Sequence, residues 1–183
     1  MMKFRIKPNN SWYYKVRGEI YVKLEEYEQA LADYTQAINL QPDEGEYYEK
    51  RGQLYHLQGD REKAKIDYLK LLKLEETNLF SLVSLGILSY QENKPEPAQK
   101  YFQQALENAQ KEKSPSANWH YVAISQLGIG QTETALETYR QAKIDIDIAL
   151  ENLYFLQKSP HPPAGVDEAI KILEIKLKKV DGG

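Results

Sequence analysis

One fixed spacing links related segments of this chain, and it constrains the fold more than any other feature. The pentapeptide RGEIY at residues 17–21 returns as RGQLY at residues 51–55, and Gly86 stands at the glycine position after one more such step. Alanine follows the same spacing, at Ala30, Ala64 and Ala98, and returns slightly later than the period at Ala135. Repetition at a period of about 34 residues indicates stacked supersecondary units, each of which buries its apolar face against its neighbours.

The residue types at the repeated positions suit a hairpin of two helices. An aromatic residue stands one helical turn after each of these alanines, at Tyr34, Tyr68, Phe102 and Tyr139. Glycine inside a helix costs about 1 kcal/mol relative to alanine, so its recurrence indicates a place where two antiparallel helices approach closely and a large ring fills the remaining space. We expect the tyrosines at repeated positions to pack in the core, namely Tyr21, Tyr34, Tyr55, Tyr68 and Tyr139.

This pattern resembles the tetratricopeptide repeat (TPR) family, whose helix-turn-helix unit carries W-x2-L-G-x2-Y, then A-x3-F, then P. The first copy matches at Tyr14, Gly18, Tyr21, Ala30, Tyr34 and Pro42. Later copies lose single positions, and Glu76 stands where the second copy would have its proline. The resemblance implies an all-α protein, a right-handed α-solenoid (superhelix) of antiparallel helix hairpins with about ten helices.

The period also predicts how the chain is organised. We expect residues 1–10 to form an N-terminal arm and residues 11–183 a single TPR domain. The predicted repeats span about 11–44, 45–78, 79–112 and 116–149, followed by a degenerate capping hairpin at 145–180. The second helix of that hairpin is expected to cap the open end of the stack, because terminal repeats of solenoids are usually atypical.

Local signals mark several helix starts. Asp60 and Thr77 are predicted N-caps, and Pro95 suits the first turn of a helix because its missing N–H has no partner there in any case.

The residue inventory excludes several kinds of chemistry. The chain has no cysteine, so it has no disulfide, thiolate zinc site or cysteine nucleophile. Its three histidines, His56, His120 and His161, are far apart in sequence, and the metalloprotease, phosphate-loop and nucleophile-elbow motifs are missing. We therefore predict that the chain is not an enzyme and has no catalytic residue, no cofactor and no metal ligand.

Charge and hydropathy indicate which partners to expect. A formal net charge of -3 argues against nucleic acid, which normally requires a basic face. The N-terminus MMKFRIKPNN lacks the apolar core of a signal peptide, and no window approaches the roughly 18 apolar residues of a membrane span. We expect no membrane insertion and a cytoplasmic protein.

The resemblance also implies a binding groove, because the first helices of TPR hairpins line a concave surface that takes a peptide. The family's groove positions fall in the first two hairpins on Trp12, Lys15, Glu19, Val22, Glu46, Glu49, Gln53 and His56. In the next two hairpins they fall on Phe80, Val83, Ile87, Tyr90, Ala117, His120, Ile124 and Leu127. The first half of the predicted groove is polar and the second half is apolar.

These features predict a non-catalytic protein-protein interaction module, an adaptor or assembly scaffold that binds a peptide or protein segment in the groove. The alternative is a dedicated chaperone or assembly factor that shields an apolar segment of one client. We hypothesise that an apolar partner segment covers the second half of the groove, with another copy of the chain or the chain's own ends as the alternative occupants. The subtype that clamps chaperone carboxylates is disfavoured, because Glu19, Phe80 and Ser84 stand where it uses Asn, Lys and Arg.

Overall fold

A computed structural model of the chain describes residues 9–111, 118–141 and 146–181. Within these ranges the chain forms helices and no strand, so the predicted all-α fold class is confirmed. The chain divides into two compact units, residues 1–76 and 77–183, and each is described by itself. The predicted groove residue Ala117 and most of the predicted N-terminal arm lie outside the described residues.

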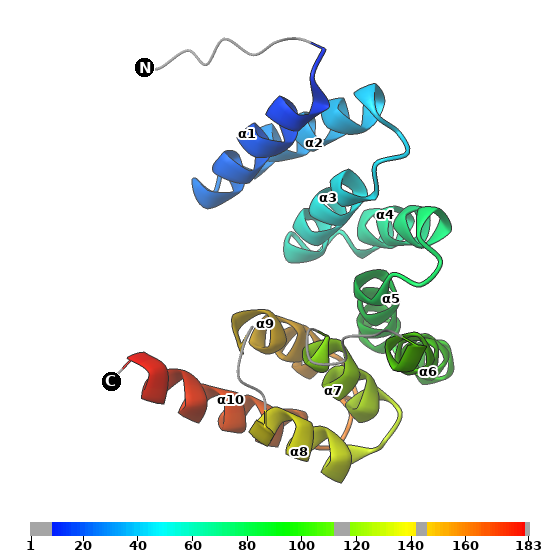
Figure 1. The fold of residues 1–183 in the computed structure, drawn as a ribbon, viewed down its shortest axis with the longest axis vertical. Coiled ribbons are helices and arrows are strands. Elements are labelled where there is room, and N and C mark those ends of the chain that lie inside the picture. Colours follow the sequence, from blue (N-terminus) through cyan, green and yellow to red (C-terminus); the bar gives the residue numbers. More distant parts are fainter. Residues whose placement is uncertain (1–8, 112–117, 142–145, 182–183) are drawn as a thin grey trace. The chain divides into compact units, whose positions relative to one another are not determined.

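The first unit contains two helical hairpins. Its helices are α1 (Ser11–Lys23), α2 (Tyr27–Leu40), α3 (Gly45–Leu57) and α4 (Arg61–Leu74). Helix α1 packs on α2, α3 packs on α4, and α2 also packs on α3, which joins the two hairpins. The unit is coloured blue to green in Figure 1.

The second unit contains two further hairpins and a C-terminal helix pair. Its helices are α5 (Leu79–Gln91), α6 (Pro95–Lys111), α7 (Trp119–Gly128), α8 (Thr132–Gln141), α9 (Ile146–Gln157) and α10 (Val166–Asp181). Helix α6 packs on α7 as α2 packs on α3, so the stacking rule of the first unit is repeated. Helix α10 packs on α8 and α9, whereas α9 lies against α5 and α7 (Figure 1).

The helix starts follow from local side-chain chemistry. The side chain of Asn10 accepts a hydrogen bond from the backbone N–H of Trp12, and Asp60 Oδ1 accepts one from Lys63 N at 3.2 Å. The predicted cap at Asp60 and the predicted start at Pro95 are confirmed. The predicted cap at Thr77 is wrong by one residue, because Asn78 accepts the hydrogen bond from Ser81 N at 2.8 Å.

The recurring glycine lies where the sequence predicts a close approach. A Cβ at Gly52 would lie 2.7 Å from Cε1 of Tyr68, and one at Gly86 would lie 2.8 Å from the ring of Phe102. Gly18 faces Tyr34 in the same way, at 2.7 Å. In each of these hairpins a glycine of the first helix therefore receives the aromatic ring of the second helix, which explains why the two residues recur together.

The outer face of α1 differs from the equivalent face of α3. Tyr47 and Leu54 in α3 are buried, at 4% and 3% exposed, in the helix that packs on α2. Their equivalents one repeat earlier, Tyr13 and Ile20, are 38% and 42% exposed. The same helix face is thus covered in the second hairpin and open to solvent in the first.

Candidate protein-binding surfaces

The first helices of the first unit present a face of mixed charge, here called the α1/α3 face. It consists of the predicted groove residues Trp12, Lys15, Glu19, Val22, Glu46, Glu49 and Gln53. Trp12 is its most accessible aromatic side chain, with 54% of its surface exposed. Its ring makes an edge contact with Tyr13, at 5.4 Å between centroids.

Lys15 joins the two helices of this face. Its Nζ lies 2.9 Å from Oε1 of Glu46 in α3 and 3.6 Å from Oε1 of Glu19 in α1. The hydrogen bond to Glu46 is the main cause that raises the pKa of Lys15 above its ordinary value, against the opposing effect of burial. Ion pairs at a protein surface contribute only about 0–1 kcal/mol, so a partner can exchange contacts with these charges at little cost to folding.

Glu49 lies in a less hydrated part of the same face. Burial is the largest cause that raises its pKa above the ordinary glutamate value, and the neighbouring carboxylates Glu46 and Glu75 raise it further. Lys50 acts in the opposite direction, with its Nζ 3.7 Å from Oε1 of Glu49. The face therefore carries more carboxylates than ammonium groups near Glu49.

Two predicted groove residues of the first unit belong to its packing. His56 is only 6% exposed and makes an edge contact with the ring of Tyr68, at 6.4 Å between centroids. Val22 is half-buried and packs against the cluster formed by Ala30, Tyr34 and Leu54. The assignment of His56 to a partner-contacting surface is therefore corrected, because its ring lies in the hairpin interior.

The predicted groove residues of the second unit are mostly buried within the chain. They form what we call the α5/α7 face, which consists of Phe80, Val83, Ile87, Tyr90, His120, Ile124 and Leu127. Five of these side chains are at most 5% exposed, namely Val83, Ile87, His120, Ile124 and Leu127. Tyr90 is half-buried, and its hydroxyl donates to the carbonyl of Gly128 at 2.9 Å.

The helix that lies against this face is the chain's own α9. The hypothesis that an apolar partner segment covers the second half of the groove left the chain's own ends as an alternative occupant, and here an internal helix of the chain lies against both α5 and α7. Val83, Ile87, His120, Ile124 and Leu127 are not accessible in this structure. The two helices that carry them pack against α6 as well as against α9, and α7 also packs against α8. An apolar stripe in the sequence has the same pattern whether a helix of the same chain or a partner segment covers it.

Sequence reasoning missed a pair of buried ion pairs that recurs with the repeat. Arg51 donates from Nε and one terminal nitrogen to both carboxylate oxygens of Asp67, at 2.8 and 2.7 Å. Arg17 binds Asp33 in the same way, at 2.6 Å for both bonds. Asp33 and Asp67 are only 4% and 1% exposed. The signal was present, because this arginine and this aspartate occupy the same positions in the first two repeats.

These arginines also change the interpretation of two repeated tyrosines. The guanidinium carbon of Arg51 lies 5.9 Å from the ring centroids of both Tyr48 and Tyr55. Tyr21 and Tyr55 are half-buried next to an arginine, whereas Tyr34, Tyr68 and Tyr139 are at most 2% exposed. The prediction of core packing is thus correct for the three second-helix tyrosines, and Tyr21 packs at the edge of the cluster formed by Ala30, Tyr34 and Leu54. Tyr21 and Tyr55 also flank the ion pairs.

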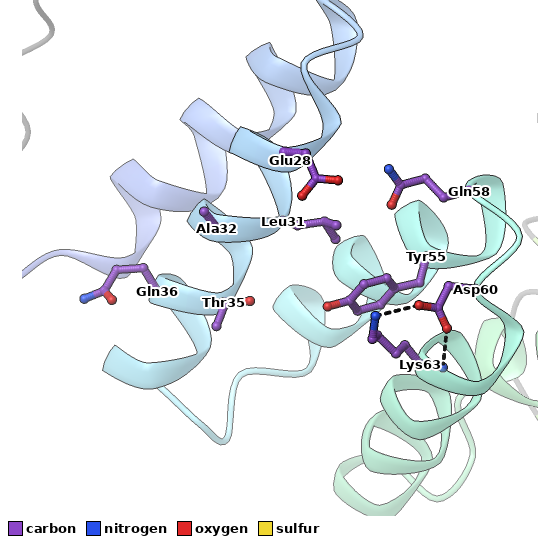
Figure 2. A pocket seen from close by; sticks show the side chains of 9 residues that line it. All are labelled: Glu28, Leu31, Ala32, Thr35, Gln36, Tyr55, Gln58, Asp60 and Lys63. Atoms are coloured by element: carbon purple, nitrogen blue, oxygen red, sulfur yellow. Dashed lines mark hydrogen bonds and ion pairs between the residues drawn. The ribbon is translucent and has the colours of Figure 1, made fainter.

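A separate pocket of about 720 Å³ lies in the first unit between α2 and the turn from α3 to α4. Figure 2 shows Leu31 and Thr35 of α2 opposite the ring of Tyr55, with Asp60 and Lys63 at the other wall. Lys63 Nζ is 2.6 Å from Oδ2 of Asp60 and 5.2 Å from the centroid of Tyr55. The pocket is therefore polar, and its ammonium group is already paired with one of its carboxylates.

The described part of the chain shows neither a metal-binding cluster nor a helix that could span a membrane. No group of three or more histidine, aspartate or glutamate side chains there is placed to hold a metal ion. Among the helices described, none has the length and apolar character needed to cross a membrane.

Antiparallel hairpins in which a glycine of one helix meets a ring of the next define the chain as a helical repeat protein. Two family models match it, described as "TPR repeat" over residues 18–59 and "Tetratricopeptide repeat" over residues 45–78. Residues 18–78 therefore carry tetratricopeptide repeats. A search of curated proteins gives no match.

Solved structures agree with this fold. A tetratricopeptide repeat protein from Parabacteroides merdae superposes with a TM-score of 0.59 at 16% identity, over 92% of this chain and 72% of that one. YrrB, described as a TPR protein with an unusual peptide-binding site, gives 0.54 at 20% identity over 94% of both chains. The first TPR of Spaghetti (RPAP3), bound to the HSP90 peptide SRMEEVD, gives 0.53 at 19% identity over 68% of this chain and 97% of that one.

Proposed function

We propose that this chain is a non-catalytic protein-interaction module, an adaptor or assembly scaffold, that binds a peptide or protein segment on the α1/α3 face. The observation that supports it best is the contrast between two equivalent faces. The α1/α3 face has an exposed tryptophan and charged side chains at its surface, whereas most side chains of the α5/α7 face are buried and α9 lies against both of its helices. Peptide binding by YrrB and by the first TPR of Spaghetti makes a peptide the natural class of ligand for the same fold.

The chemistry of the α1/α3 face suits recognition of a polar segment. Trp12 supplies a large apolar contact on a side chain with few rotatable bonds, which is typical of interface anchors. Lys15, Glu19 and Glu46 supply charges that fix the register of a bound chain. Shielding of an apolar client and self-association through the apolar groove are not proposed, because α9 already covers the apolar face.

Site-specific photocrosslinking tests this proposal. A photoreactive side chain at position 12 is expected to form an adduct with a defined partner segment, which mass spectrometry identifies. The matched control places the same group at Ile66 of α4, which is 64% exposed but lies outside the α1/α3 face. Reversing charge with Lys15→Glu is expected to reduce the adduct from position 12. Equal adducts from both positions, or an adduct that Lys15→Glu does not change, would contradict the proposal.

A further inference from the structure

Helix α9 does not continue the stack as the first helix of a fifth repeat. Within each unit the second helix of one hairpin packs on the first helix of the next, as α2 packs on α3 and α6 on α7. After α8 this place belongs to α10, which packs on α8. Helix α9 lies instead against α5 and α7, the first helices of both hairpins in its unit. It lies against the two helices that carry the predicted groove residues of this unit.

Helix α9 and the pair α5 and α7 both have buried apolar side chains. Helix α9 has a stripe of four buried apolar residues, with exposed fractions between 0% and 7%, at Ala149, Leu150, Leu153 and Leu156. The apolar residues of the α5/α7 face are equally buried, with Val83, Ile87 and Ile124 at 1% exposed and Leu127 at 0%. Helix α9 is therefore amphipathic, and its apolar residues are buried in a helix that packs against α5, α7 and α10. An amphipathic helix whose apolar face lies in a groove is a common mode of peptide recognition.

A polar contact fixes the position of the helix end. The last four carbonyl groups of a helix have no partner within the helix itself. Phe155 lies in the last turn of α9, and its carbonyl oxygen accepts a hydrogen bond from Nε2 of Gln91 at 2.9 Å. Gln91 is the last residue of α5 and is only 7% exposed. The groove therefore has a buried donor that recognises the C-terminal end of a bound helix.

The segment that follows α9 is attached at the same place. Nδ1 of His161 lies 3.2 Å from Oδ1 of Asn93, in the turn that follows α5. On its other side, α9 is linked to α10 through exposed residues, with Tyr154 donating to Glu174 at 2.8 Å and Gln157 to Asp167 at 2.7 Å. Helix α9 is thus held by side-chain contacts on two sides, as a docked segment would be.

From these contacts we infer that the α5/α7 face is a binding site for an amphipathic helix, and that α9 is its intramolecular occupant. The ligand class is a helix with apolar residues at the spacing of Leu150, Leu153 and Leu156 and a free carbonyl near its C-terminal end for Gln91. A linked occupant acts at an effective concentration of the order of millimolar. Helix α9 therefore excludes external helices of ordinary affinity and leaves the α1/α3 face as the open one.

Weakening α9 within the full chain tests this inference. The variant Leu150→Ala/Leu153→Ala reduces the apolar surface of α9 and leaves the α5/α7 face unchanged. A fluorescent peptide with the sequence of residues 146–157 is the probe. It is expected to bind this variant at least about 10-fold more tightly than the wild-type chain, whose intact α9 competes with it. Adding Gln91→Ala is expected to reduce that binding, and a peptide with aspartate at both leucine positions is the matched control.

No preference of the peptide for the weakened variant, in a chain whose circular dichroism shows intact hairpins, would overturn the inference. If the variant unfolds, native-state hydrogen exchange of the wild-type chain decides. A docked α9 is expected to exchange through local opening, at least about 10-fold faster than the protected amides of α5 and α7. Equal protection in all three helices would show that α9 is an inseparable part of the core and would overturn the inference.

Discussion

The buried ion pair between Arg51 and Asp67 gives the sharpest test of how the first unit is held together. Asp67 accepts two hydrogen bonds from one guanidinium group, and its side chain is only 2% exposed. Replacing it in Asp67→Ala leaves a charged arginine without its carboxylate. Breaking a buried pair on one side typically costs about 3–5 kcal/mol, because the remaining charge is uncompensated.

Arg51 can recover part of this loss. Its side chain is 17% exposed, and it keeps a hydrogen bond to Oγ1 of Thr35 at 3.0 Å. We therefore expect Asp67→Ala to lower the free energy of unfolding by about 3 kcal/mol, the lower end of the range for buried pairs. Asp33→Ala is the matched comparison, because the side chain of Arg17 is 33% exposed. Its cost should be smaller, about 1–2 kcal/mol, since water can solvate the released arginine.

Urea unfolding followed by circular dichroism at the helical band measures both values. A double-mutant cycle with Arg51→Met then separates the pair from the rest of the side-chain losses. Equal losses for the two aspartates, or a loss below about 1 kcal/mol for Asp67→Ala, would refute the argument that burial determines the value of these pairs.

The same structure predicts three further outcomes. Gly52→Ala should lower the free energy of unfolding by about 1 kcal/mol, because overpacking against Tyr68 costs more than the gain in helix propensity. Thermal or urea unfolding measures this, and a net stabilisation would show that the ring of Tyr68 moves freely. Leu54→Glu should unfold the first unit, while Ile20→Glu at the equivalent exposed position should change stability by no more than about 0.5 kcal/mol. Similar losses for both variants would contradict the conclusion that this helix face is buried in α3 and exposed in α1. Glu49 has a raised pKa, so the folded state binds its proton more tightly and stability falls as pH rises above the ordinary glutamate value of 4.5. Glu49→Gln should reduce that fall in urea titrations at successive pH values, and an unchanged pH profile would exclude this carboxyl as its source.

Much of the hairpin architecture was predictable because its signals are local or periodic. A glycine that recurs together with an aromatic ring in the following helix, as Gly52 and Tyr68 do, reports a contact within one hairpin. Asp60 could be recognised as a cap because the amide whose hydrogen bond it accepts lies one turn further along the chain. The Arg51 and Asp67 pair was equally visible in the period, but charged residues on helices are usually solvated, and their pattern does not show which of them are buried.

The candidate site was less predictable, because it depends on what covers each helix. Trp12 and Glu46 are exposed as the groove pattern predicts, whereas Ile87 and Leu127, at other predicted groove positions, are buried. The amino-acid sequence by itself determined the repeat and the hairpins. Only the tertiary structure decided that α9 lies against α5 and α7 in the second unit, because an apolar face is stabilised equally by any helix that removes it from water.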